Sequence, residues 1–212
     1  MSSAGRGGVR NQADNYPTPP WVVERLLESV PLPRGRWLEP CAGDGAIISL
    51  VPDVDWFVFD IRPETRPALE ALNPMYVGIG DALQVSWPQV DVMLTNPPFN
   101  LAVEFITKSL EVADHTVCLL RLNFLGGAER CEWLQRTQPD VWVLPQRPSF
   151  ANKCKNGCKS LLPPDVFQCP CGAKATPKTD STEYAWFHWH AQSSGIVRVL
   201  NLTPLEERRR VA

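Results

Sequence analysis

Residues 94–100, "LTNPPFN", place an asparagine, two prolines and a phenylalanine directly after an apolar run. Proline has no N–H group to give to a sheet, so a buried strand has to end here. The amide of Asn96 can accept hydrogen bonds, and Phe99 offers an aromatic surface. Between them, Pro97 and Pro98 hold the backbone carbonyls in fixed directions. The turn is therefore suited to orienting a planar polar group, and the alternative is a strand that simply ends in a proline-rich turn.

A second candidate site is the segment "EPCAGDG", residues 39–45, which follows another apolar run. Gly43 and Gly45 would lie between a strand and a helix, where small residues let a ligand approach the backbone and free N–H groups are available. A dinucleotide-binding turn would have a third glycine, but Ile48 occupies that position. A pyrophosphate ligand is therefore disfavoured.

Three acidic residues, Glu39, Asp60 and Asp81, end three successive expected strands. A carboxylate in this place can accept hydrogen bonds from ribose hydroxyls. Each acid alone is also compatible with capping a helix or a turn. Their recurrence at successive strand ends favours a cofactor that contains a nucleoside.

Four of the seven cysteines lie in one short segment, with the spacings C-x3-C and C-x-C. Two close pairs of thiols near glycine predict one structural zinc ion. Its ligands would be Cys154, Cys158, Cys169 and Cys171. If one close pair does not chelate, His188 or His190 could replace a thiol, although both are expected in a strand. The alternative is a group of reactive or adventitious thiols.

The segment around these cysteines is basic, in a chain whose net charge is −2. Residues 147–178 carry six basic side chains against Asp165, a net charge of +5 that leaves −7 for the rest of the chain. A basic arm on an acidic body predicts contacts with nucleic-acid phosphates. The candidate side chains are Arg147, Lys153, Lys155, Lys159 and Lys174. The alternative is a solvated, lysine-rich loop that zinc holds together.

The elements that must position these residues alternate between strands and helices. Strands are expected at residues 36–41, 55–61, 75–81, 90–95, 115–122, 140–145, 183–190 and 195–202. A helix is expected to start within residues 46–51, and further helices are expected at 63–72, 101–113 and 128–137. Repeated strand–helix units with apolar strands predict an α/β fold whose mostly parallel sheet is covered on both faces. In such folds, ligands lie beyond the carboxyl ends of the strands.

The expected domain organisation is one domain with an insertion. A disordered tail is expected at residues 1–14, the domain at 15–204, a zinc-binding basic insertion within it at 152–174, and a charged tail at 205–212. No apolar run approaches the roughly 20 residues that span a bilayer, and the first residues do not resemble an export signal. A cytoplasmic protein that makes no membrane contact and has no disulfides is expected.

The order of the segments "EPCAGDG", "FDI", "GDAL" and "NPPF" resembles that of the class I S-adenosylmethionine-dependent methyltransferases that modify the exocyclic N6 amine of adenine. The small phage and bacterial adenine-DNA methyltransferases are the most similar group. Residues 16–27, "YPTPPWVVERLL", are similar to the segment that these enzymes place before the glycine turn. The resemblance implies a Rossmann-like fold with a mostly parallel seven-stranded sheet, S-adenosylmethionine as cofactor and DNA as partner. The residues implied to line the cofactor are Tyr16, Thr18, Pro19, Glu39, Pro40, Ala42, Gly43, Gly45, Asp60, Ile61, Asp81 and Ala82.

The same resemblance gives the turn at residues 96–99 a catalytic role. The side-chain oxygen of Asn96 and the carbonyl of Pro97 would accept hydrogen bonds from the adenine amine. Phe99 would stack on a base flipped out of the double helix. The alternatives are the same reaction on RNA, methylation of glutamine amides in proteins, and a catalytically inactive nucleic-acid-binding module built on the same scaffold.

Overall fold

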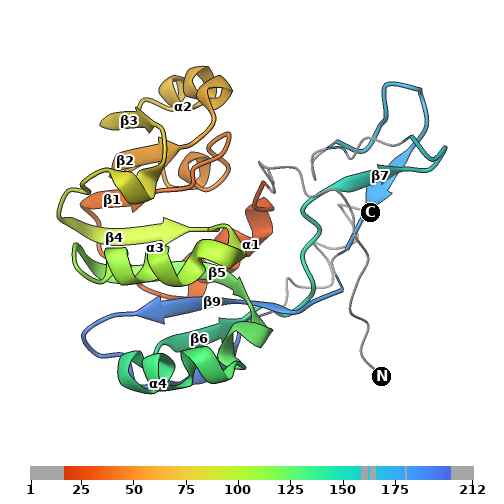
Figure 1. Cartoon of the computed structure of the whole chain (residues 1–212). Coiled ribbons are helices and arrows are strands. Elements are labelled where there is room, and N and C mark those ends of the chain that lie inside the picture. The colour runs from red at the N-terminus through yellow and green to blue at the C-terminus, as the bar shows by residue number, and fades with distance from the viewer. Residues whose placement is uncertain (1–16, 159–161, 163–165, 180, 202–212) are drawn as a thin grey trace.

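The computed structural model describes residues 17–158, 162, 166–179 and 181–201. Tyr16, Lys159 and the expected tails at residues 1–14 and 205–212 lie outside the described residues. Figure 1 shows a layered body built on one large sheet, and an arm that extends away from it. No helix within the described ranges is long and apolar enough to cross a membrane.

Eight strands form the large sheet, in the order β10-β6-β9-β5-β4-β1-β2-β3 (Figure 1). Their bounds are Arg36–Glu39 (β1), Asp55–Asp60 (β2), Tyr76–Ile79 (β3), Val90–Thr95 (β4), Ala113–Arg121 (β5), Asp140–Val143 (β6), Tyr184–Trp189 (β9) and Val197–Val199 (β10). Neighbouring strands are parallel except at β9, which is antiparallel to both β5 and β6. The sheet is mostly parallel as expected, but it has eight strands rather than seven because β10 pairs with β6.

Alternate residues of the central strands pack into two cores, one on each face of the sheet. One core contains Trp37, Val92 and Leu94, whereas Leu38 belongs to the other. This alternation follows from the two-residue repeat of a strand. Because both faces are covered, a central strand needs apolar residues at nearly every position, and residues 117–120 are each at most 1 % exposed.

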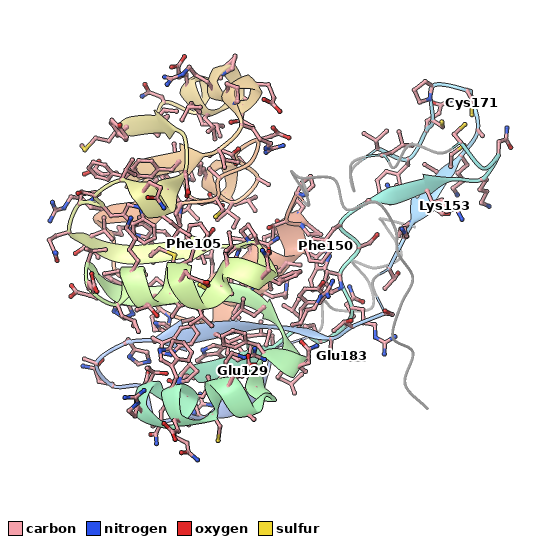
Figure 2. All side chains as sticks on the ribbon, viewed as in Figure 1. Phe105, Glu129, Phe150, Lys153, Cys171 and Glu183 are labelled. Atoms are coloured by element: carbon pink, nitrogen blue, oxygen red, sulfur yellow. The ribbon has the colours of Figure 1, made fainter. Side chains whose placement is uncertain are left out.

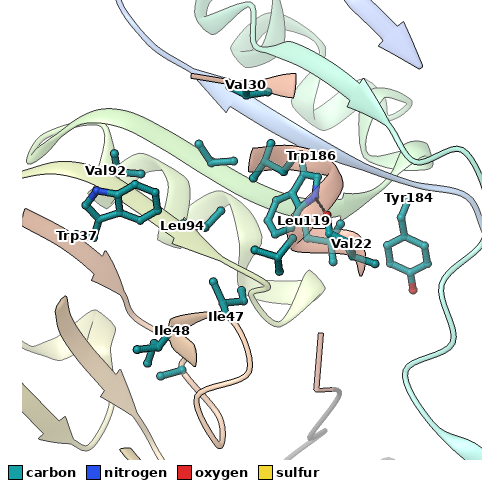
Figure 3. Close-up of a cluster of buried hydrophobic side chains, with 14 of the residues drawn as sticks. Val22, Val30, Trp37, Ile47, Ile48, Val92, Leu94, Leu119, Tyr184 and Trp186 are labelled. Carbon is teal, nitrogen blue, oxygen red and sulfur yellow. Dashed lines mark hydrogen bonds between the residues drawn. The ribbon is translucent and has the colours of Figure 1, made fainter. Parts of the chain in front are cut away.

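Helices cover both faces of the sheet. On one face lies α1 (Pro20–Ser29), and Trp186 of β9 donates its indole N–H to the carbonyl of Val22 in this helix over 2.9 Å (Figure 3). On the other face lie α3 (Ala102–Ser109) and α4 (Ala128–Thr137), where Phe105 of α3 is buried. The contact with Trp186 fixes the start of α1 and hence the residues that precede it.

Two of the helices expected from the sequence differ in the structure. The prediction of a helix at residues 46–51 was wrong, because the structure has turns and one short 3₁₀ segment, Ile48–Leu50. Pro52 cannot donate to a continuing helix, and β2 begins three residues later. The helix expected at 63–72 is divided into a 3₁₀ turn, Pro63–Thr65, and α2 (Arg66–Ala71). Pro67 lacks an N–H group, so it is tolerated only in the first turn of α2.

The chain leaves the large sheet after β6 and returns at β9, and residues 144–183 between them are called the arm. Within the arm, β7 (Asn152–Cys154) and β8 (Ala175–Pro177) form a separate two-stranded antiparallel sheet. Figure 1 shows the arm projecting from the sheet. Because β6 runs parallel to the central strands, the arm begins at the end of the sheet where those strands have their carboxyl ends; this end is called the carboxyl edge of the sheet.

Candidate functional site

The glycine turn after β1 is tied to the end of β2. Gly43 donates its N–H to Asp60 Oδ2 over 2.7 Å. Gly43 and Gly45 have φ angles of 57° and 85°, in the left-handed region that glycine adopts without strain. A Cβ atom at Gly45 would lie 2.3 Å from Leu72 Cδ1, so a side chain there would require Leu72 to move. The sequence therefore uses glycine for both the backbone angle and the close approach.

Asp60 is a structural brace at the end of β2. Its second oxygen, Oδ1, accepts the backbone N–H of Arg62 over 2.9 Å and the Arg62 Nε–H over 3.0 Å. The residue is only 6 % exposed. A carboxylate can accept about four hydrogen bonds, so Asp60 retains capacity for a ligand. The next side chain, Ile61, is 65 % exposed and gives the edge an apolar surface.

Glu39 lies buried at the end of β1, with 2 % of its surface exposed. Its Oε2 atom is buried and has no hydrogen-bond partner among the described residues. Burial raises the pKa of this carboxyl well above its usual range, and the charge of Asp60 raises it further. A buried polar atom without a partner is unusual and suggests that a ligand supplies one. Three other candidate cofactor residues are also buried: Pro19, Pro40 and Ala42.

Asp81 caps a turn, which is the alternative that the sequence left open for the acids. Its Oδ1 accepts the N–H of Leu83 over 2.9 Å, at the start of the 3₁₀ turn Ala82–Gln84. Lys108 of α3 donates to the carbonyls of Ala82 and Leu83, each over 2.9 Å. The exposed Asp81 therefore sits on a loop that α3 holds in place.

The turn after β4 is held against the segment that precedes α1. Asn96 Nδ2 donates to Thr18 Oγ1 over 3.1 Å, and Thr18 is 4 % exposed. Because Nδ2 is the donor in this contact, the Asn96 amide presents Oδ1 as its acceptor. Pro97 is buried, Pro98 is exposed, and Phe99 is half-buried at the start of the 3₁₀ turn Phe99–Leu101.

Three side chains around Phe99 were not foreseen from the sequence. The guanidinium carbon of Arg121 lies 4.7 Å from the centre of the Phe99 ring, and Arg121 Nε donates to the Tyr184 hydroxyl over 3.2 Å. The Tyr184 ring contacts Phe99 and also Phe150, with centroid distances of 5.8 and 5.2 Å. Arg121 could have been found, because it is the last polar residue of a strand expected at 115–122. Nothing in the sequence signals that Tyr184 and Phe150 join the base of the arm to this turn.

The four cysteines expected to bind a metal lie together in the arm. Figure 2 shows one of them, Cys171, near the far end of the arm. Their Sγ atoms are all within 4.8 Å of one another, and those of Cys154 and Cys171 are 3.5 Å apart. Four sulfurs bound tetrahedrally to zinc at about 2.3 Å would lie about 3.8 Å apart. The donor set and its spacing therefore fit a zinc ion. His188 and His190 belong to a different cluster and do not replace a thiol.

Local backbone geometry supports this cluster. Gly157 and Gly172 have φ angles of 75° and 84°. Each donates its N–H to the carbonyl of the first cysteine of a pair, Gly157 to Cys154 and Gly172 to Cys169, and so closes a tight turn. Burial disfavours ionisation of Cys154, but hydrogen bonds from the N–H groups of Asn156 and Cys158 lower its pKa to about 6. A thiolate stabilised in this way is the form that binds metal.

The basic residues of the arm have two different environments. Lys153, Lys155 and Lys174 are exposed, and Figure 2 shows Lys153 far from the large sheet. Arg147 instead donates through Nε to Glu183 Oε1 over 2.8 Å, at the base of the arm. The lysines are available to an external anion, whereas Arg147 has an internal partner.

Neither a family model nor a curated protein matches this sequence. Solved structures match the fold. The 23S rRNA methyltransferase ErmE superposes with a TM-score of 0.55 at 13 % identity, over 92 % of this chain and 75 % of its own. A Vibrio vulnificus protein described as a modification subunit of a type I restriction enzyme gives 0.53 at 14 % identity, over 92 % of this chain and 49 % of its own. A dimethyladenosine transferase from Plasmodium falciparum gives 0.50 at 13 % identity, over 83 % and 63 %.

These likenesses, together with the strand order, define a Rossmann-like class I methyltransferase fold. In this fold, the carboxyl ends of β1, β2 and β4 meet at one edge, which carries Glu39, Asp60 and Asn96. The sequence signals at residues 39–45 and 94–100 are therefore brought to the same side of the sheet.

Proposed function

We propose that this protein transfers a methyl group from S-adenosylmethionine to the N6 amine of adenine in DNA. The observation that carries the proposal is the Asn96–Thr18 contact, which turns the Asn96 oxygen into the acceptor of the turn after β4. This acceptor lies at the sheet edge that also carries the glycine turn and the buried acids. A polar orienting group and a nucleoside-compatible edge are the two parts that this reaction requires.

The cofactor would occupy the edge formed by β1, β2 and the loops that follow them. When bound, S-adenosylmethionine supplies an electrophilic methyl group. The unpartnered oxygen of buried Glu39 fits a ligand that brings hydrogen-bond donors, and exposed Ile61 fits one that brings an apolar ring face. Asp60 would accept from ribose hydroxyls while it holds the glycine turn. The wider set proposed is Tyr16, Thr18, Pro19, Pro40, Ala42, Gly43, Gly45, Asp81 and Ala82.

The turn after β4 would orient the target amine. Asn96 Oδ1 and the carbonyl of Pro97 would each accept one amine hydrogen, which directs the nitrogen lone pair away from the base plane. Preorganised acceptors lower the barrier without acting as bases. Arg121 covers one face of Phe99, so the flipped base would stack on the other face.

The arm would contact the substrate and hold one structural zinc ion through Cys154, Cys158, Cys169 and Cys171. We place residues 152–174 of the arm as an insertion in a methyltransferase domain at 15–204. Its exposed lysines would contact phosphates, since cationic side chains away from internal acids are free to replace counterions. The Phe150–Tyr184–Phe99 contacts would link the position of the arm to the catalytic turn.

RNA is the second candidate substrate, because the 23S rRNA methyltransferase ErmE superposes over 92 % of this chain. The test uses purified protein, S-adenosylmethionine labelled in its methyl group, and three acceptors: genomic DNA that lacks adenine methylation, total RNA, and a protein extract. Labelled N6-methyladenine in DNA is the expected product. Label found only in RNA, or only in glutamine amides, would overturn the DNA assignment. No transfer to any acceptor by protein that binds the cofactor would favour an inactive binding module.

A further inference from the structure

All three histidines of the chain meet at one place, although they are far apart in the sequence. His115 lies on β5, His188 lies on β9, and His190 follows β9 by one residue. One ring nitrogen of each is within 4.8 Å of those of the other two. The His188 and His190 rings stack with centroids 4.2 Å apart, and the His115 and His188 rings lie 5.1 Å apart.

This cluster is separate from the site already described. His115 is near the amino end of β5, whereas Arg121 ends that strand beside Phe99. The antiparallel pairing places the last residues of β9 beside the first residues of β5. The histidines therefore lie at the opposite edge of the sheet from the catalytic turn, and they are also distinct from the cysteine cluster.

We propose that His115, His188 and His190 bind one divalent transition-metal ion of the zinc, cobalt, nickel and copper group. Imidazole nitrogens are preferred ligands of these ions, and three of them leave a further position for water or a carboxylate. The distance from His115 Nδ1 to His188 Nε2 is 2.8 Å. Two nitrogens that share a metal ion at about 2.1 Å lie roughly 3 to 3.4 Å apart, so binding requires the rings to separate and to turn their lone pairs toward the ion.

A hydrogen bond between two histidines leaves the position of the third unexplained. It pairs His115 Nδ1 with Nε2 of His188, a residue that is 3 % exposed, and it does not involve the His190 ring. His188 Nδ1 is buried and has no hydrogen-bond partner within the described ranges, so Nε2 is the nitrogen of this ring that faces the cluster.

Asp140 of β6 supports the third ligand in the way that acids commonly support metal-bound histidine. Its Oδ2 is 3.1 Å from His190 Nε2, and its Oδ1 accepts the N–H groups of Ser194 and Ile196 over 3.0 and 3.1 Å. With Nε2–H donating to a fixed carboxylate, Nδ1 of His190 carries the lone pair. The backbone N–H of Gln192 approaches this atom at 3.3 Å, a long contact that a metal ion would replace.

One member of the cluster, His190, borders a cavity. A cavity of about 250 Å³ is lined by His190 and by neighbouring residues that include Asp114 and Thr137. A bound ion would connect the start of β5 to the end of β9 and, through Asp140, to β6. The expected consequence is greater stability of β5, β6 and β9, of which β5 carries Arg121 and β9 carries Tyr184.

The experiment compares metal binding by wild-type protein, His115→Gln, His190→Gln and the control Gln135→Ala, an exposed residue on α4, each stripped with a chelator and titrated with Co²⁺. Thiolate-bound Co²⁺ has a strong near-ultraviolet charge-transfer band that imidazole-bound Co²⁺ lacks. Each histidine variant should bind about one equivalent less than wild type and keep the full thiolate band. The control should bind as wild type does. Equal metal content in folded wild type and both folded histidine variants would overturn the proposal.

A second measurement applies if the histidine variants do not fold. Wild-type protein loaded with excess Zn²⁺ and then desalted is studied by X-ray absorption at the zinc edge. The proposal expects a mixture of nitrogen and sulfur neighbours, with nitrogen from the histidine site. A sulfur-only first shell would contradict it.

Discussion

The side-chain amide of Asn96 donates a hydrogen bond to the hydroxyl of Thr18 across 3.1 Å, which joins the end of β4 to the segment that precedes α1. Thr18 is itself held by a helix whose Val22 carbonyl accepts the indole N–H of Trp186. The orientation of the Asn96 amide is therefore set by packing on the α1 face of the sheet, and not by the turn alone. A site whose acceptor is fixed before substrate arrives loses less freedom on binding.

The first prediction tests this orienting contact. Thr18→Val keeps the shape of the side chain but removes the hydroxyl, so the Asn96 amide loses one of the contacts that orient it and turnover should fall by about tenfold. Thr18→Ser retains the hydroxyl and should keep most of the activity. Single-turnover methylation rates measure both. Equal loss in the serine variant would assign the effect to packing instead of to the hydrogen bond.

The second prediction concerns Asn96 itself. Asn96→Ala removes one acceptor for the target amine and should lower turnover by about 10²-fold or more, as for loss of a positioned transition-state contact. Cofactor affinity, measured by calorimetry, should change much less. Asn100→Ala removes an exposed amide four residues later and serves as the control. Near-normal methylation by the Asn96 variant would remove the basis for the catalytic assignment.

The third prediction separates two roles of Asp60. Asp60→Ala removes the proposed acceptor for the cofactor and the partner of Gly43, and affinity for S-adenosylmethionine should weaken by about 1–3 kcal/mol. Arg62→Gln removes only the internal ion pair and should leave cofactor affinity close to that of wild type. If the two variants weaken binding equally, Asp60 acts by shaping its loop, and a direct ribose contact is excluded.

Much of the sheet could be predicted from the sequence, because most of the central strands are apolar runs that end at or beside an acid, a glycine or a proline; β5 instead ends at Arg121. All eight strand positions expected along the chain are present, with bounds shifted by a few residues. The first and last residues of the helices were harder to predict, because the prolines at 52 and 67 decide where helical hydrogen bonding can start or continue. The C-x3-C and C-x-C spacing correctly indicated one cluster of four thiols.

The candidate site was predictable only where strand ends determine it. Parallel strands share an edge, so Glu39, Asp60 and Asn96 could be grouped from their positions in the sequence alone. The contact of Arg121 with Tyr184 spans 63 residues and depends on how β9 inserts beside β5. The histidine cluster depends on the same insertion, which no local pattern specifies.

The fourth prediction follows from the raised pKa of Glu39. In the unfolded chain this carboxyl titrates near 4.5, and in the folded apo protein it titrates higher because it is buried. The folded state therefore holds a proton that the unfolded state releases, and stability falls as pH rises from 4.5 through the folded pKa.

Glu39→Gln removes this titration. The apo variant should be more stable than wild type near pH 8, by about 1–3 kcal/mol, and the difference should disappear at acidic pH. Urea unfolding at several pH values measures it, with Glu24→Gln as a control that removes an exposed helical carboxylate. The same variant should bind the cofactor more weakly. A constant stability difference across pH would show that Glu39 does not titrate with folding.

The fifth prediction concerns the arm. Cys169→Ser should lower the zinc content by about one equivalent and expose the backbone of β7 and β8 to hydrogen exchange. Cys131→Ser replaces an exposed cysteine on α4 outside the cluster, and its zinc content should equal that of wild type. Cofactor affinity should persist in both variants, because the strands that carry Glu39, Asp60 and Asn96 lie outside the arm.

The same two variants test the role of the arm in binding DNA. DNA affinity should fall only in Cys169→Ser, with a shallower dependence on salt because fewer lysines displace counterions from phosphates. Unaltered DNA binding after zinc loss would show that the arm has only a structural role. Loss of cofactor binding would show that the Phe150–Tyr184–Phe99 contacts stabilise the end of the sheet that carries Glu39, Asp60 and Asn96.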